Sequence, residues 1–128
     1  MTRVLFVCLH NAGRSQMSRA LFERAADGRH EARSAGTTPG ERVHPEVVEA
    51  MRELGIDLSG VRPQLLTDDL AREADLLVTM GCGEACPHVP GLAREDWPLP
   101  DPKGQPPARV REIRDEIRAR VEDLAAGF

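Results

Sequence analysis

The hydrophobic positions of this chain follow two periods, which separate the expected strands from the expected helices. Residues 3–8 and 74–80 are almost continuously apolar, as strands are when both faces of their sheet are covered. Two shorter segments, residues 30–35 and 95–99, are also predicted to be strands, and Trp97 lies in the second.

Amphipathic spacing, with apolar residues three and four positions apart, indicates four helices between these strands. They are predicted over residues 15–26, 45–54, 68–72 and 110–124. Ser15 and Thr67 are expected to cap the first and third helices, and Gly55 to end the second. The last helix has the clearest apolar stripe, formed by Val110, Ile113, Ile117, Val121 and Leu124. On its exposed side Arg111–Asp115 and Glu116–Arg120 are spaced to form ion pairs.

The alternation of strands and helices predicts an α/β fold with a doubly wound, mostly parallel sheet in a single domain over residues 1–128. Ligands of such sheets bind at the carboxyl ends of the strands, near the point where the strand order reverses. The loop that begins at Cys8 follows the first strand. The loops that carry Cys82 and Asp101 are expected to follow later strands and to reach the same edge.

The composition makes several classes of function less expected for this protein. The net charge is −4, so a general attraction to nucleic acid or to an anionic membrane is not expected. No apolar run approaches the ~20 residues that cross a bilayer, and the N-terminus does not have the pattern of a signal peptide. The three cysteines of what we expect to be a cytoplasmic monomer are typical of catalysis, redox exchange or metal binding rather than of a disulfide framework.

The segment from Cys8 to Ser15 carries the main candidate chemistry. Between a strand and a helix, its backbone N–H groups can surround an oxyanion, and the helix N-terminus adds partial positive charge. Arg14 offers a planar pair of donors, and the same field favours the nucleophilic thiolate of Cys8. A cysteine at a strand end is often just a small buried residue, but packing alone requires none of its neighbours. The predicted oxyanion-binding residues are Leu9, His10, Asn11, Ala12, Gly13 and Arg14.

Several residues have expected supporting roles. Ser15 can donate its hydroxyl to the Cys8 sulfur, and the Asn11 amide can brace the loop. Gly13 permits a backbone path that a Cβ would hinder, and His10 is expected to point outward. Asp101 precedes a proline in a stiff loop, so it is either a turn former or a general acid for the leaving oxygen.

Cys82 and Cys86 lie in a glycine-rich loop after the strand at residues 74–80. They are candidates for a thiol relay, since thiol–disulfide exchange needs an accessible second sulfur near the first. Gly81 and Gly83 would supply the mobility that such a relay needs. Two incidental thiols, or a metal site completed by His88, are the alternatives.

The stretch Val4–Ser18 resembles the low-molecular-weight protein tyrosine phosphatase family, whose loop has the pattern Cys-x5-Arg-Ser/Thr. The sequence from His10 to Ser18 is closer to the arsenate reductase branch of the family. Further matches to the family are Ser34-Ala35-Gly36, Val78-Thr79-Met80 and Asp101-Pro102-Lys103-Gly104. The resemblance implies a three-layer, flavodoxin-like fold in which helices cover both faces of a four-stranded parallel sheet. It also favours the general-acid role of Asp101.

The arsenate reductase resemblance implies a three-thiol cycle without a cofactor or a metal. Cys8 attacks arsenate, Cys82 attacks Cys8 as arsenite leaves, and Cys86 moves the disulfide to Cys82–Cys86. Thioredoxin, or another thiol reductant, then reduces it. A phosphatase that forms a phosphocysteine, and a non-catalytic protein that binds oxyanions, arsenite or metal, are the competing hypotheses.

Overall fold

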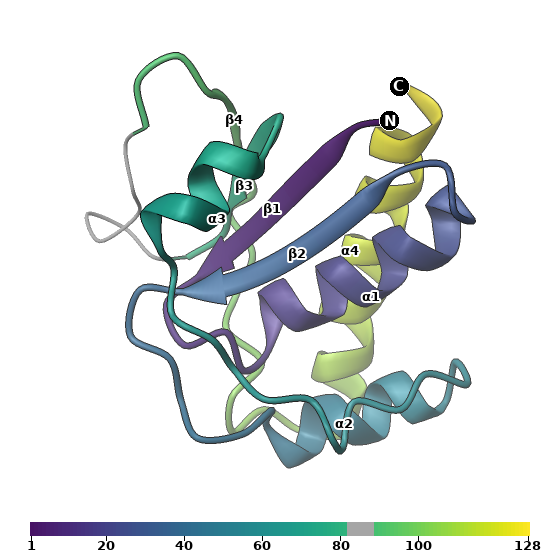
Figure 1. The fold of residues 1–128 in the computed structure, drawn as a ribbon. Helices are drawn as coiled ribbons and strands as arrows, with labels where there is room; N and C mark the ends of the chain where they lie inside the picture. Colours follow the sequence, from purple (N-terminus) through teal and green to yellow (C-terminus); the bar gives the residue numbers. More distant parts are fainter. Residues whose placement is uncertain (82–88) are drawn as a thin grey trace.

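A computed structural model describes residues 1–81 and 89–128 of the chain. Four strands form one parallel sheet in the order β2-β1-β3-β4, visible in Figure 1. The strands are β1 (Arg3–Cys8), β2 (Glu31–Gly36), β3 (Leu76–Thr79) and β4 (Ala93–Asp96). Every strand pair is parallel, so the carboxyl ends of all four strands lie at one edge.

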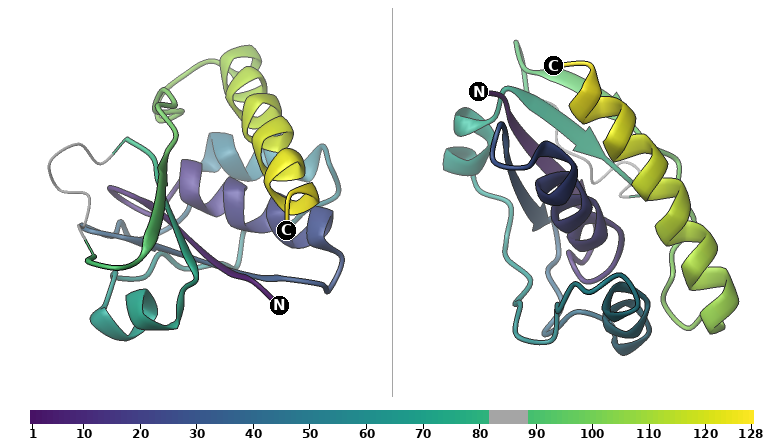
Figure 2. Two further views of the ribbon diagram at one scale, coloured as in Figure 1. Left: turned by 90° about the horizontal axis from the view of Figure 1, so that it is seen from above. Right: turned by 90° about the vertical axis from the view of Figure 1, so that its right-hand side faces the viewer.

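Helices cover both faces of this sheet. They are α1 (Arg14–Ala26), α2 (Pro45–Arg52), α3 (Asp68–Glu73) and α4 (Pro107–Ala126). The two long helices α1 and α4 pack on one face together with α2, and the short α3 lies on the other (Figure 2). The predicted three-layer, flavodoxin-like fold is therefore confirmed. Within residues 1–81 and 89–128, no helix has the length and apolar character needed to cross a membrane.

The larger core lies between the sheet and the face formed by α1 and α4. Phe6 of β1 is fully buried there, and its ring centroid lies 5.8 Å from those of Phe22 and Trp97. The apolar stripe predicted for the last helix is confirmed, because Val110, Ile113, Ile117 and Val121 are buried. A smaller core of Leu5, Val7, Ala35 and Leu77 lies on the opposite face, beneath α3.

Several boundaries differ from prediction. Strand β4 covers residues 93–96 instead of 95–99. Trp97 lies just beyond the strand, where its backbone N–H still bonds the Thr79 carbonyl of β3 at 2.8 Å. All four residues of this edge strand are exposed, so no apolar alternation marked its position. Helix α2 ends at Arg52, and a turn to Gly55, with φ of +78°, follows it. Strand β3 is four residues long.

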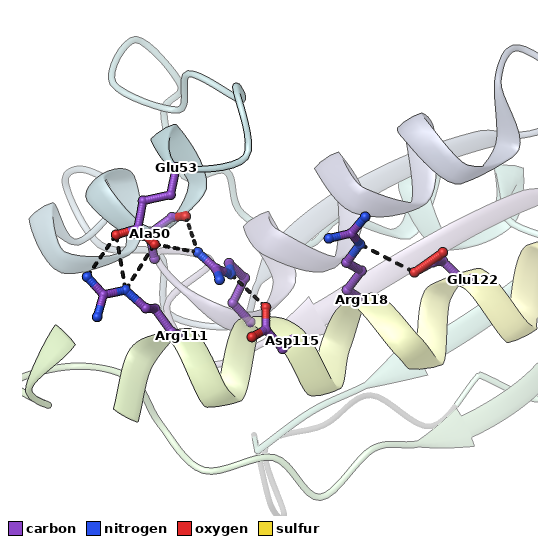
Figure 3. A network of polar contacts seen from close by, with 7 residues as sticks. Ala50, Glu53, Arg111, Asp115, Arg118 and Glu122 are labelled. Carbon is purple, nitrogen blue, oxygen red and sulfur yellow. Dashed lines mark hydrogen bonds and ion pairs between the residues drawn. The ribbon is translucent and has the colours of Figure 1, made fainter. Parts of the chain in front are cut away.

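Helix α4 is tied to α2 by a charged network that the sequence did not reveal (Figure 3). Arg111 bonds Glu53 with its Nε and Nη2 atoms, and does not form the expected pair with Asp115. Arg114 is 7% exposed, and its Nη1 donates to Glu53 at 2.8 Å and to the Ala50 carbonyl at 2.7 Å. This network fixes the end of α2 relative to α4.

The strand order reverses between β1 and β3. The chain leaves β1 for β2 on one side and later returns to β3 on the other side of β1. In a sheet of this kind, ligands bind at the carboxyl edge near this reversal of strand order. The segment from Cys8 to Arg14 and the residue Gly81 both lie at this place.

Candidate functional site

The loop between β1 and α1 has all its carbonyl groups bonded to donors outside it. The backbone of residues 38–44 supplies three of these bonds, and the first turn of α1 supplies the others. They run from Thr38 N to Leu9 O (2.8 Å), Gly40 N to His10 O (2.9 Å), Gln16 Nε2 to Asn11 O (3.1 Å), His44 N to Ala12 O (2.9 Å) and Met17 N to Gly13 O (3.0 Å).

The backbone N–H groups of the same loop differ from its carbonyl groups in this respect. In the described part of the chain, no acceptor bonds the backbone N–H of residues 10–13. The first turn of the 13-residue helix α1 begins directly after them and adds its own unpaired N–H groups. Donors without a protein partner at a helix N-terminus form a binding site for an anion.

The orientation of the Asn11 amide follows from its partners. Its Oδ1 accepts from the backbone N–H of Gln64 at 3.0 Å, and a backbone N–H can only donate. The other end, Nδ2, therefore faces Ser15 and donates to its Oγ at 2.8 Å. The predicted bracing role of Asn11 agrees with this geometry, and its φ of +50° places it in the left-handed region that asparagine tolerates.

Ser15 consequently has its proton free for Cys8. Its Oγ accepts from Asn11 and lies 2.9 Å from the Cys8 sulfur, so the hydroxyl proton is free to be donated to that sulfur. The predicted N-cap role of Ser15 is wrong. Helix α1 begins at Arg14, Gly13 is at the cap position, and no side chain caps the helix.

Two glutamines complete the bracing, and sequence reasoning missed both. Gln16 is 1% exposed, and its Nε2 donates to both oxygens of Asn11, at 3.1 and 3.0 Å. Gln64 holds Asn11 from a distance of 53 residues in sequence. Its position directly after the Cys8–Ser15 segment, in the first turn of α1, could have indicated Gln16. No local signal exists for Gln64, because its segment is irregular.

Arg14 lies at the carboxyl edge of the sheet with its guanidinium held in place. The residue is 8% exposed, and its Nη1 donates to the Leu99 carbonyl at 2.9 Å. Its Nη2 lies 3.9 Å from Asp101 Oδ2. The structure thus brings Arg14, Cys8 and Asp101, which are far apart in sequence, to one edge of the sheet.

Asp101 forms a turn, and its general-acid role stays a prediction. Its Oδ1 accepts from Lys103 N at 3.0 Å, which is the bond of a turn-forming aspartate. Its other oxygen faces Arg14, and the side chain remains about half exposed. Pro102 packs against the loop of residues 9–13, called the oxyanion loop below, since a Cβ on Gly13 would lie 3.0 Å from Pro102 Cγ. A side chain at position 13 would therefore require Pro102 to shift by a few tenths of an ångström.

Two histidines border the loop. His10 Nδ1 lies 3.0 Å from the Thr38 carbonyl, so this nitrogen carries a proton and ties the ring to residues 38–44. His44 lies beside Gly13 and begins α2. Burial lowers the pKa of His44 below its usual value, although the carboxylates of Glu46 and Asp101 act in the opposite direction. A neutral imidazole therefore borders the site at pH 7.

Comparison with known proteins agrees with this geometry. Residues 3–128 match the family model of the low molecular weight phosphotyrosine protein phosphatases. The chain belongs to this family. The match spans both the oxyanion loop and the segment that carries Asp101.

Several similar family members are arsenate reductases by name. A putative arsenate reductase of Halobacterium salinarum is 44% identical over 99% of this chain and 93% of its own length. A glutaredoxin arsenate reductase of Synechocystis is 36% identical over 98% of both chains. Among solved structures, the thioredoxin-dependent arsenate reductase of Corynebacterium glutamicum has a TM-score of 0.85 and 42% identity. That match covers 99% of this chain but 61% of the Corynebacterium chain.

The remaining candidate residues of this family member cannot be placed. Cys82 and Cys86, and the His88 that a metal site would require, lie outside the described residues, between Gly81 and Val89. In residues 1–81 and 89–128 there is no cluster of three histidine, cysteine or acidic side chains that could hold a metal ion. The thiol relay therefore stays a prediction from the sequence.

Proposed function

We propose that this chain reduces arsenate to arsenite, with Cys8 as the nucleophile. The contact between the Ser15 hydroxyl and the Cys8 sulfur carries the proposal, because it offers a hydrogen-bond donor to a sulfur nucleophile at the start of the loop that carries the amides of residues 10–13. The relatives named arsenate reductase support the choice of arsenate, a tetrahedral oxyanion of the size that such a loop surrounds.

In the first step the amides of residues 10–13 and the Arg14 guanidinium hold arsenate. The Cys8 thiolate attacks arsenic and forms an As–S bond, and one oxygen of arsenate leaves. Asp101 protonates this oxygen, so that it departs as water. Arg14 and the loop amides offset the negative charge that builds up in the transition state.

In the second step two electrons move from sulfur to arsenic. The Cys82 thiolate attacks the Cys8 sulfur, an S–S bond forms, and the As–S electron pair stays with arsenic, which leaves as arsenite. Cys86 then attacks Cys82 and frees Cys8 as a thiolate. An external dithiol reduces the Cys82–Cys86 disulfide. We propose thioredoxin for this role, following the name of the Corynebacterium relative, although the Synechocystis name points to glutaredoxin.

A coupled assay tests the proposal. Arsenate should drive NADPH oxidation in the presence of thioredoxin and thioredoxin reductase, and glutaredoxin with glutathione should be compared in parallel. Cys8→Ser should abolish turnover, and Cys82→Ser should stop multiple turnover but leave phosphate binding intact. Cys86→Ser should accumulate a Cys8–Cys82 disulfide or a mixed disulfide, which intact-mass analysis detects. Full coupled activity of Cys82→Ser would contradict the relay.

The family's phosphatase activity is the second candidate. Every part of the oxyanion loop and the position of Asp101 suit a phosphate monoester equally well, and the family model carries the phosphatase description. Release of p-nitrophenol from its phosphate ester measures this activity. Rapid ester hydrolysis without arsenate-dependent NADPH oxidation would reverse the ranking.

The same proposal includes a monomer in the cytoplasm, where thiol reductants are available. Among the described residues, the large hydrophobic side chains that are exposed are Met1, Leu65 and Phe128. Light scattering after size exclusion should give a mass near 14.1 kDa, and a value near twice this mass would contradict the monomer.

A further inference from the structure

Gly81 lies directly against the guanidinium of Arg14. It follows β3 at the carboxyl edge of the sheet and has a φ of +72°. A Cβ built on its backbone would lie 1.8 Å from Arg14 Nη1, 2.5 Å from Cζ and 2.9 Å from Nη2. All three distances are below those that real Cβ atoms show, so no residue with a side chain fits beside Arg14 in this position.

The Arg14 guanidinium has no equivalent place to move to. Its Nη1 is bonded to the Leu99 carbonyl at 2.9 Å, and the residue is 8% exposed. Its Nη2 lies 3.9 Å from Asp101 Oδ2. A displacement that relieved a contact at position 81 would therefore break the bond to Leu99 or change the separation from Asp101.

We propose that Gly81 is a positioning residue for Arg14, and that its missing side chain reserves the space in which the guanidinium is aligned for the oxyanion. This rests on the proposed role of Arg14 in holding the oxyanion. The steric contact distinguishes Gly81 from other glycines with positive φ. Gly28, Gly91 and Gly104 have similar backbone angles, but a Cβ on any of them would have no neighbour within 4 Å.

Gly81 therefore has a steric role besides the mobility expected of it. Mobility of the cysteine segment was the expected reason for glycine here, and the contact with Arg14 is independent of it. The contact with Arg14 therefore limits the size of the residue at position 81, independently of any role of Cys82 and Cys86.

Phosphate binding to the Gly81→Ala variant tests this contact. The dissociation constant of inorganic phosphate is measured from its protection of Cys8 against iodoacetamide, with the modified peptide identified by mass. We expect binding to weaken by about tenfold to a hundredfold, the range for a misplaced charged hydrogen bond. Gly28→Ala is the matched control, because it adds a Cβ at a φ of +81° without touching Arg14. Its phosphate binding should stay within about twofold of wild type.

A double-mutant comparison shows whether Gly81 acts through Arg14. Arg14→Lys keeps the positive charge but removes the three guanidinium atoms that a Cβ at position 81 would meet. Adding Gly81→Ala to Arg14→Lys should weaken phosphate binding by less than about twofold. The same loss in both backgrounds, or wild-type binding in Gly81→Ala, overturns the proposal.

Thermal unfolding covers the case in which Gly81→Ala does not fold. The double variant should then be more stable than Gly81→Ala alone, because the clashing atoms are gone. Equal instability would assign the defect to the backbone at position 81 and overturn the proposal. Unchanged phosphate binding in Arg14→Lys would instead refute the proposed role of Arg14. Weakened binding in Arg14→Lys with normal binding in Gly81→Ala refutes only the inference about Gly81.

Discussion

At the scale of single residues, the reactivity of Cys8 depends on the direction of one proton. The backbone N–H of Gln64 fixes the Asn11 amide, that amide occupies the Ser15 oxygen, and the Ser15 hydrogen is left for sulfur. Each of these bonds is 2.8 to 3.0 Å long, and the side chains of Asn11, Ser15 and Cys8 are buried. Buried polar side chains linked in this way hold one arrangement, because breaking any bond leaves an unpaired group.

Replacement of Ser15 by alanine should slow the reaction of Cys8. The thiolate loses its hydroxyl donor, and an unpaired Asn11 amide remains, which costs about 1–3 kcal/mol. We expect iodoacetamide to modify Cys8 about tenfold more slowly at pH 7, as measured by peptide mass. Ser18→Ala is the control, because Ser18 is equally buried on α1 but bonds the Arg14 carbonyl and Met80 instead. Equal rates in the two variants would show that Ser15 does not act on Cys8.

Replacement of Asp101 by asparagine should separate chemistry from binding. Loss of a general acid typically lowers a rate by about 10²–10⁴-fold. We expect a fall in that range in the single-turnover formation of arsenite, with phosphate binding changed by less than about fivefold. Asp57→Asn is the control, because Asp57 forms the same kind of turn, with Ser59 N at 2.9 Å. An equal effect of both substitutions would make Asp101 a turn former alone.

At the scale of secondary-structure elements, Glu53 joins the end of α2 to α4. Hydrogen bonds from Arg111 and Arg114 lower the pKa of Glu53 from 4.5 to about 2. A carboxyl group whose pKa is lowered in the folded state stabilises the protein above its ordinary pKa. That stabilisation is lost as the pH falls from about 4.5 toward 2.

Replacement of Glu53 by glutamine should therefore change how stability depends on pH. The variant should unfold at a lower temperature than wild type at pH 7, and the difference should shrink between pH 4.5 and pH 2, as followed by circular dichroism. Glu49→Gln is the control, because Glu49 lies on the same helix and pairs with Arg52 at the surface. A constant difference across this pH range would show that the Glu53 carboxylate does not contribute through its charge.

At the scale of the whole molecule, the site joins segments from opposite ends of the chain. The oxyanion loop follows β1, Gly81 follows β3, and Leu99 and Asp101 precede α4. An anion bound among them stabilises only the folded state, since the unfolded chain does not bring these groups together.

Phosphate should consequently raise the unfolding temperature. At a concentration a hundred times its dissociation constant, the gain is about 2.7 kcal/mol, or roughly ten degrees for a domain of this size. Sodium chloride at equal ionic strength should give a much smaller shift, and Arg14→Lys should reduce the effect of phosphate. Equal shifts with both salts would indicate general screening instead of a specific anion site.

The sequence alone determined the family, the layered parallel fold and the position of the oxyanion loop. The reason is that these features depend on local pattern. The spacing of apolar residues follows the period of each element, and Cys8, Arg14 and Ser15 lie within eight residues of one another. The predicted bounds of an element were wrong where no apolar pattern marks it, as in the exposed edge strand β4.

Tertiary structure decided what distant segments do to that loop. The role of Ser15, the contacts of Gln64 and the steric limit at Gly81 all depend on partners at least seven residues away, and in two cases more than fifty. Only folding brings groups so far apart in sequence within bonding distance, and the local spacing of apolar residues does not predict these contacts.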